Sequence, residues 1–155
     1  MKLILYLLLP EPPPTPTNLT IMEISSRSVK VSWTVENVAP GVESIVVQWK
    51  EHTEDWFPEG KQSVLPGPVA ETVVPGLRPW TVYHLRVFAE NQMGKSKEGK
   101  VLQFVTNGEK PGGTPRNLRI TGISSTSLEV TWDDPEKRLM HGPITRYNLG
   151  YREYK

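Results

Sequence analysis

Short segments that alternate apolar and polar residues recur through the first hundred positions of the chain. Val29, Val31 and Trp33, for example, alternate with Ser28, Lys30 and Ser32. A period of two residues is typical of β-strands that bury one face. The predicted strands cover residues 19–24, 29–33, 45–49, 69–74, 83–89 and 101–105, with one more short strand within 52–68. No segment has a helical period, and the 15 prolines and 12 glycines separate the apolar runs. The pattern therefore predicts an all-β fold, a seven-stranded β-sandwich.

The beginning of this pattern occurs twice. Residues 16–33, PTNLTIMEISSRSVKVSW, and residues 115–132, PRNLRITGISSTSLEVTW, are identical at ten of eighteen positions without a gap. The offset of 99 residues pairs Trp33 with Trp132, and it equals the length of a whole small domain rather than of a solenoid repeat. At the third strand the offset grows to 102, because Tyr151 aligns with Trp49. The second copy is thus expected to have a longer loop after its second strand.

These observations predict one complete sandwich and one truncated copy. The expected segments are a Pro-rich signal-like or linker segment at 1–15, a first domain at 16–106, a linker at 107–114, and a second domain at 115–155 that stops after its third strand. Three strands with an uncovered apolar face do not close a sandwich. The chain is accordingly interpreted as a fragment of a longer array.

The N-terminus is apolar but short. Lys2 followed by Leu3–Leu9 is similar to the front half of a secretory signal, although no small-x-small cleavage site follows. The alternative is a remnant of an upstream segment. The PEPPPTP run at 10–16 is expected to be an extended linker, because proline fixes the backbone and lacks an N–H donor.

Composition argues against several classes of chemistry. The net charge of +1 gives no field that would hold nucleic acid, and the absence of cysteine excludes thiolate metal sites and disulfides. His52, His84 and His141 have no carboxylate or second histidine at ligand spacing in the sequence. No nucleophile elbow and no phosphate-binding loop occur. We therefore expect no enzyme, no cofactor, no metal and no small-molecule substrate.

Residues 76–96, GLRPWTVYHLRVFAENQMGKS, combine with the Pro-x-Asn-Leu start and Trp33 to resemble a fibronectin type III domain. Within them, Leu-x-Pro-x-Thr-x-Tyr is similar to that family's tyrosine corner, which implies that the Tyr83 phenol bonds to nearby backbone. The core is then expected to contain the following residues: Trp33, Trp49, Leu77, Tyr83, Leu85 and Val87, with Trp132 as the counterpart in the second copy.

A narrower resemblance concerns the amino-acid sequences of two segments. TWDDPEKRLMHGPITRYNLGYREYK resembles the second type III repeat of the Down syndrome cell adhesion molecule (Dscam) family, and VYHLRVFAENQMGKS resembles the first. Sidekick-like and contactin-like adhesion proteins share much of this sequence pattern. The resemblance implies an extracellular spacer or interaction module of a cell-surface receptor in neuronal recognition and axon guidance. Its expected partners are proteins and neighbouring immunoglobulin-like or type III domains, with a membrane reached only through other segments of a parent receptor. The alternative is a type III module of an intracellular, muscle-type protein, which the lack of cysteine also fits.

Two surface features complete the sequence-based predictions. If alternate residues of the strand at 83–89 point inward, an apolar outer face remains as a candidate contact patch, made of Val46, Trp80, Val82, Arg86 and Phe88. The alternative is that long polar side chains cover this face. Asn18-Leu19-Thr20 is a glycosylation sequon, but its counterpart Asn117 lies in no sequon, so the asparagine is also expected to have a structural role.

Overall fold

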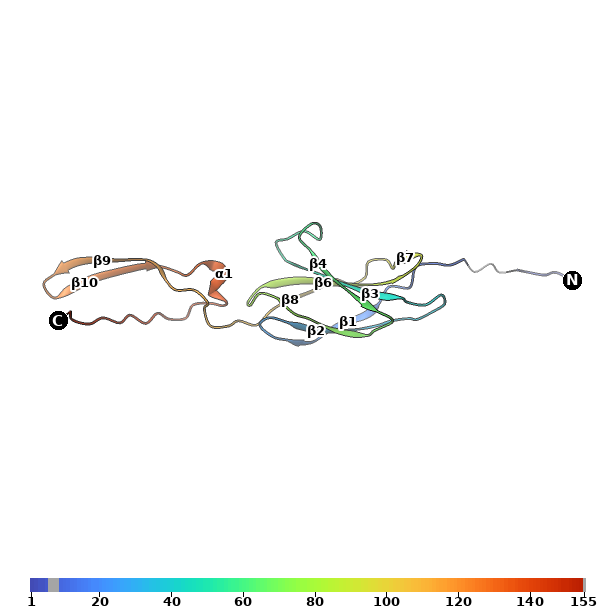
Figure 1. The fold of residues 1–155 in the computed structure, drawn as a ribbon, viewed down its shortest axis with the longest axis horizontal. Helices are drawn as coiled ribbons and strands as arrows, with labels where there is room; N and C mark the ends of the chain where they lie inside the picture. Colours follow the sequence, from blue (N-terminus) through green and yellow to red (C-terminus); the bar gives the residue numbers. More distant parts are fainter. Residues whose placement is uncertain (6–8, 155) are drawn as a thin grey trace.

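The computed structural model describes residues 1–5 and 9–154, so the signal-like N-terminal segment lies partly outside the described residues. The molecule is elongated, with the N-terminal residues at one end and a β-hairpin at the other (Figure 1). Its elements are β1 (Thr17–Ile24), β2 (Val29–Thr34), β3 (Ser44–Glu51), β4 (Lys61–Pro66), β5 (Glu71–Val74), β6 (Val82–Asn91), β7 (Gly94–Lys95), β8 (Leu102–Val105), β9 (Arg116–Ser124), β10 (Ser127–Asp133) and α1 (Lys137–Met140).

Strands β1–β8 form the predicted sandwich, which we call the first module. One sheet has the order β1-β2-β5, and the other has the order β4-β3-β6-β7 with β8 paired to β6. All of these pairings are antiparallel. The all-β sandwich expected from the period-two pattern is therefore confirmed.

The apolar faces of the two sheets meet in one core. Val31, Ile45 and Leu85 are fully buried, and Trp33 lies among them with its indole N–H donating to the Val69 carbonyl at 2.8 Å. Leu77, Tyr83 and Val87 are also buried, whereas Trp49 is only partly buried and packs against the core from its edge. Burial of this apolar surface is the main stabilising contribution to the first module.

The last strand of the sandwich is divided. The strand predicted over 101–105 is β8, and the structure adds the short strand β7 before it, separated from β8 by residues 96–101. At this break the Pro-rich lead-in approaches, since the Thr15 hydroxyl donates to the Lys97 carbonyl at 3.0 Å. A side chain at Gly99 would come within 2.7 Å of the Thr15 methyl carbon. The lead-in is thus packed along the first module.

The second module contains the β9–β10 hairpin, α1 and the segment that follows. The hairpin repeats β1–β2, but among the described residues it forms a sheet of two strands with no second sheet packed against it: Leu118 is 60% exposed, whereas its counterpart Leu19 is 6% exposed. Residues 143–154 carry no strand assignment, so the predicted third strand of this copy is not formed. Trp132, expected in a core, is instead half-buried beside Tyr147, with ring centroids 5.3 Å apart. The missing facing sheet is the physical reason for both differences.

Candidate functional site

The tyrosine corner shapes the end of the first module that faces the second. The Tyr83 hydroxyl oxygen accepts a hydrogen bond from the backbone N–H of Arg78 at 2.9 Å, and its ring stacks on Phe104 at 5.8 Å. Burial raises the pKa of the Tyr83 phenol above its ordinary value, against the smaller lowering effect of the Arg78 bond. The loop that carries Arg78 and Trp80 is therefore held in one conformation.

The linker between the modules is bonded to the first module from its first residue. The Asn107 N–H donates to the Ser25 carbonyl at 3.1 Å, and the Asn107 side chain donates to the Ile24 carbonyl at 3.1 Å. The Asn107 carbonyl in turn accepts from the N–H of Trp80 at 3.1 Å. Asn107 thus connects two loops at the same end of the sandwich.

Glu109 continues this connection with its carboxylate. Arg27 donates to it through Nε at 3.0 Å and Nη2 at 2.9 Å, and the Ser26 hydroxyl donates at 2.7 Å. These bonds, led by the one from Arg27, lower the pKa of the Glu109 carboxyl. On the other side, the Glu109 N–H donates to the His141 carbonyl at 2.8 Å. One residue therefore contacts both modules.

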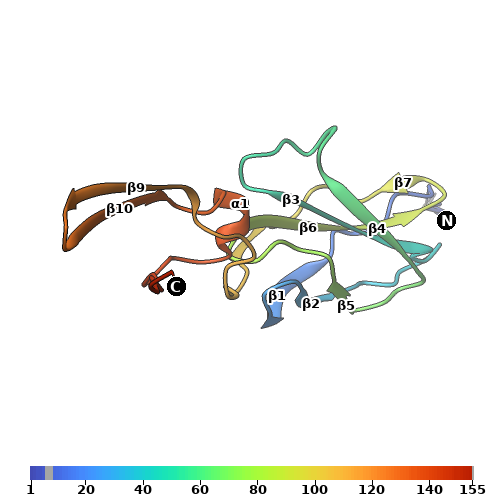
Figure 2. The same ribbon diagram turned by 60° about the vertical axis from the view of Figure 1, so that its left-hand side comes forward.

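The linker glycines allow the second module to approach closely. A Cβ at Gly108 would lie 2.9 Å from the His141 carbonyl oxygen, and one at Gly112 would lie 2.7 Å from the His141 ring. The Gly112 N–H also donates to the Leu139 carbonyl at 2.8 Å. The longer loop expected from the change of offset is thus the part of the second module that reaches the linker, and it carries α1 (Figure 2).

We use the name joint for this set of contacts between Ser25–Arg27, Asn107–Gly112 and the loop of α1. Sequence analysis identified the linker and the longer loop but not the joint itself. Arg27 and Glu109 are 82 residues apart, and no local pattern pairs them. The only sequence signal was the proximity of glycines to a single carboxylate, which is common in linkers.

The outer face of the sheet differs from the predicted contact patch. Val46 is 1% exposed and Phe88 is 9% exposed, so neither is available to a partner. Arg86 covers this face: its guanidinium carbon lies 3.9 Å from the Trp56 ring centroid and 5.2 Å from that of Phe88. Sequence analysis missed Trp56, which comes from the loop between β3 and β4. The interpretation in which long side chains cover the face accounts for these residues.

Two other members of the predicted patch occupy different positions. Val82 is half-buried, and Trp80 is 46% exposed but lies beside the joint rather than on the sheet. Arg86 is held by the Gln48 side chain at 2.9 Å and by Glu98 at 2.8 Å. Of the predicted patch, Trp80 is the exposed large aromatic residue that remains.

The histidines are closer together in space than their spacing in sequence indicated. Because β3 pairs with β6, Nδ1 of His52 lies 3.2 Å from Nε2 of His84. Both side chains are on the surface, and Gln103 also contacts His84 at 3.2 Å. Within the described residues no group of three or more histidine or carboxylate side chains is placed to hold a metal ion.

Asn18 and Asn117 have the same structural role at the start of each copy. Both adopt a left-handed conformation, with φ of 54° and 53°. Asn18 donates to the Thr34 hydroxyl at 3.2 Å, and Asn117 donates to the Asp133 carboxylate at 2.7 Å, at equivalent positions of the repeat. Asparagine tolerates this conformation better than most residues do, which gives it a reason to recur.

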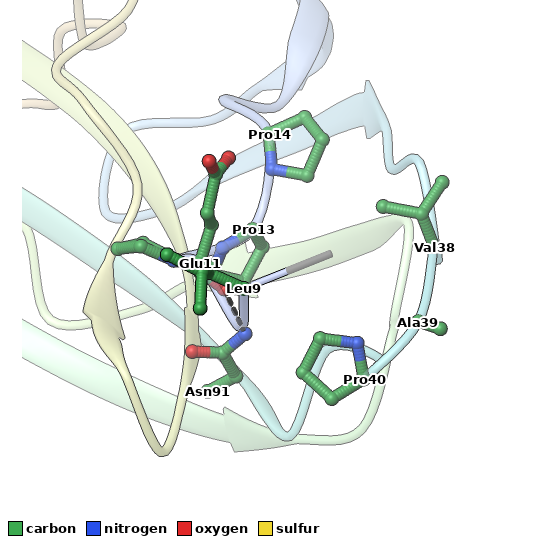
Figure 3. Close-up of a pocket in the computed structure, with 9 residues that line it drawn as sticks. Leu9, Glu11, Pro13, Pro14, Val38, Ala39, Pro40 and Asn91 are labelled. Carbon is green, nitrogen blue, oxygen red and sulfur yellow. Dashed lines mark hydrogen bonds between the residues drawn. The ribbon is translucent and has the colours of Figure 1, made fainter. Parts of the chain in front are cut away.

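A hollow lies at the end of the first module opposite the joint, around the Pro-rich lead-in (Figure 3). It has a volume of about 390 Å³ and is formed mainly by apolar residues of the lead-in and of the loop between β2 and β3. The Asn91 amide donates to the Glu11 carbonyl at 2.8 Å in its wall. Among the described residues, no helix has the length and apolar character needed to cross a bilayer.

Two antiparallel sheets with a tyrosine corner, followed by a partial copy joined through a short linker, define a tandem immunoglobulin-like β-sandwich protein. The sequence model of the fibronectin type III domain matches residues 13–105 and 113–155. The chain therefore belongs to the fibronectin type III family.

Relatives and solved structures agree with this assignment. The chain is 31% identical over 144 residues to the cell adhesion molecule DSCAM of Gallus gallus, covering 92% of this chain and 7% of that protein. The same figures apply to Dscam1 of Drosophila melanogaster, and DSCAML1 of Homo sapiens is 30% identical over 146 residues, covering 91% of this chain and 7% of that protein. The chain thus spans only a small part of these curated relatives.

Among solved structures, the crystal structure of chicken CNTN1 FN1–FN3 domains is similar with a TM-score of 0.57 and 22% identity, covering 62% of this chain and 33% of that chain. A myokine structure is similar with a TM-score of 0.53 and 20% identity, covering 61% of this chain and 98% of that chain. At these identities the likeness concerns the fold alone. The family is thus fibronectin type III, and the relatives reported above are Dscam-type cell adhesion molecules.

Proposed function

We propose that this chain is a non-enzymatic spacer of an extracellular, cell-surface adhesion receptor, and that it sets the angle between neighbouring domains. The observation that carries the proposal is Glu109, whose side chain bonds Ser26 and Arg27 while its backbone bonds His141. A bidentate pair between a guanidinium and a carboxylate fixes direction as well as distance. A linker fixed in this way transmits orientation, which a flexible Gly-rich linker does not.

The elongated arrangement supports the same function. The N-terminal residues and the β9–β10 hairpin lie at opposite ends of the long axis (Figure 1). Domains attached to such a segment are held apart at a defined spacing. The homology to cell adhesion molecules supports protein partners and neighbouring immunoglobulin-like or type III domains for this segment. A role in neuronal recognition and axon guidance is what the sequence resemblance implies.

Residual dipolar couplings of the full chain test the fixed joint. We expect amides of β1–β8 and of β9–β10 to fit one alignment tensor. Glu109→Ala is expected to require two tensors, because it removes the carboxylate that Arg27 and Ser26 bind. Glu129→Ala, an exposed glutamate of β10, is the matched control and is expected to change nothing. Two independent tensors in the unmodified chain would refute the proposal.

The cellular location is tested separately at Asn18. An extracellular chain that passes through the secretory pathway is expected to carry a glycan there, seen as a mass decrease after treatment with peptide N-glycosidase F. Asn18→Gln removes the sequon and abolishes the decrease. An unglycosylated chain found on cytosolic filaments would instead identify the intracellular, muscle-type alternative.

A further inference from the structure

The joint encloses a groove that the spacer function does not use. It has a volume of about 360 Å³, and both modules line it. The first module contributes the tyrosine-corner loop with Trp80, and the second contributes the loop of α1. The lining residues are Glu51, Arg78, Pro79, Trp80, Thr81, Lys137, Arg138 and His141. The volume lies within the range of small-ligand sites, about 300–1,000 Å³.

Trp80 has a backbone conformation that is unfavourable for tryptophan. Its φ is 47°, and for a bulky side chain a positive φ is a true outlier that costs about 1–2 kcal/mol. Glycine or asparagine would take this conformation readily. The backbone is held by bonds from Trp80 N–H to Asn107 and from Thr81 N–H to the Thr106 hydroxyl. None of these bonds involves the indole, so they do not explain why a tryptophan occupies this position. Residues in strained conformations cluster at binding sites.

The charges around the indole favour an anion. Arg78, Lys137 and Arg138 line the groove, and Glu51 is the acidic residue among its lining groups. Arg78 pairs with Glu51 at 3.3 Å, and Arg138 pairs with the adjacent Glu136 at 2.8 Å. Both arginines are largely exposed in these pairs, so each pair is weak and easily exchanged for another anion. Lys137 adds a further positive charge. The net charge of Arg78, Lys137, Arg138, Glu51 and Glu136 is therefore +1.

We propose that this groove binds an acidic sugar, with one pyranose ring on the exposed face of Trp80 and its ionised group at Lys137 and Arg138. A bare phosphate would not use the indole, whereas a pyranose has an apolar face of C–H groups that an aromatic ring covers. Arginine is suited to a planar carboxylate or a sulfate. The choice of a sugar rests on the proposed extracellular location, where acidic glycans are accessible. The groove needs both modules, so the site exists only in the tandem chain.

The test is an NMR titration of the full chain with two probes, 3′-sialyllactose for the carboxylate and a sulfated heparin disaccharide for the sulfate. Lactose is the neutral control. We expect the Trp80 indole and the amides of 137–141 to shift with one of the two probes and not with lactose. The probe that causes these shifts shows whether the groove binds a carboxylate or a sulfate. Trp80→Gly is expected to weaken binding about tenfold, and Lys137→Gln about threefold.

Lys97→Gln is the matched control, because it removes the same charge near the opposite end of the first module, where Lys97 lies beside the Pro-rich lead-in. It is expected to leave the affinity unchanged. Two results would overturn the site: no shift with either probe at about 10 mM, well above a millimolar dissociation constant, or an equal loss from Lys97→Gln and Lys137→Gln, which indicates general charge attraction. The fixed joint is read from dipolar couplings without any sugar, so either proposal can fail while the other holds.

Discussion

The internal repeat allows one substitution to be made at two equivalent positions, with a large loss of stability expected at one and a small loss at the other. Val31 in β2 and Val130 in β10 are related by the offset of 99 residues. Val31 is fully buried, whereas Val130 is only half-buried in a hairpin that no sheet of the described residues covers. Val31→Ala removes two buried carbon groups, worth about 1.6 kcal/mol in transfer free energy, and leaves a cavity that brings the loss to about 2–3 kcal/mol. Val130→Ala is expected to cost less than about 0.5 kcal/mol.

Urea unfolding of the full chain, followed by tryptophan fluorescence, measures both values. Trp33 is buried in the first module, so its emission reports the loss of that core. With an m-value of about 1.5 kcal/mol/M, Val31→Ala should lower the midpoint by about 1.3–2 M, and Val130→Ala by less than about 0.3 M. Equal shifts for the two variants would refute the reasoning, because they would mean that the second copy has a core of its own.

Four further predictions follow from individual contacts. Tyr83→Phe leaves the Arg78 N–H without its partner and is expected to lower the free energy of unfolding by about 1–3 kcal/mol, while Tyr151→Phe on the exposed C-terminal segment changes nothing in the same urea assay. Since the folded-state pKa of Tyr83 is raised, its contribution to stability is complete below the ordinary value of 10.0 and is lost as the pH rises above it, so Tyr83→Phe should show less alkaline destabilisation. The Glu109 pKa is lowered, so its contribution to the joint is present above the ordinary value of 4.5 and is lost as the pH falls through the lowered pKa; dipolar couplings at low pH should separate into two tensors. Trp56→Ala uncovers Arg86 and should cost about 0.5–2 kcal/mol of unfolding free energy, whereas Phe57→Ala at the exposed neighbouring position should cost almost nothing.

The strands and most of the core of the first module could be predicted because their signal is local. A two-residue period places Val29, Val31 and Trp33 on one face, and all three are buried. Tyr83, Leu85 and Val87 follow the same rule in β6. The repeat then reinforces the strand boundaries, since the same pattern appears twice in one chain.

The surface could not be predicted in the same way, because it depends on segments without a period. Residues 52–60 contain Trp56 and no alternation, so nothing in the sequence indicated that this loop covers Arg86. The period correctly assigned Val46 and Phe88 to the outer face, but it does not distinguish a face open to solvent from one that is covered. The joint could not be predicted for a related reason, since Glu109 bonds to residues that are more than 80 positions away in the sequence.

The second copy shows what the local pattern specifies and what it leaves to the rest of the fold. Leu19 and Leu118 occupy the same position in nearly the same hairpin, yet the first is buried and the second is exposed. The difference arises from the sheet of β3, β6 and β8, which covers β1–β2. In the part of the chain that the structure describes, no such sheet covers β9–β10. A period of two is therefore sufficient to form a hairpin, whereas burial requires partners from distant segments. The same reasoning explains why the joint uses loops. Residues such as Arg27 and His141 lie outside the strand pattern, so they are free to set the angle between modules without disturbing the core of the first module.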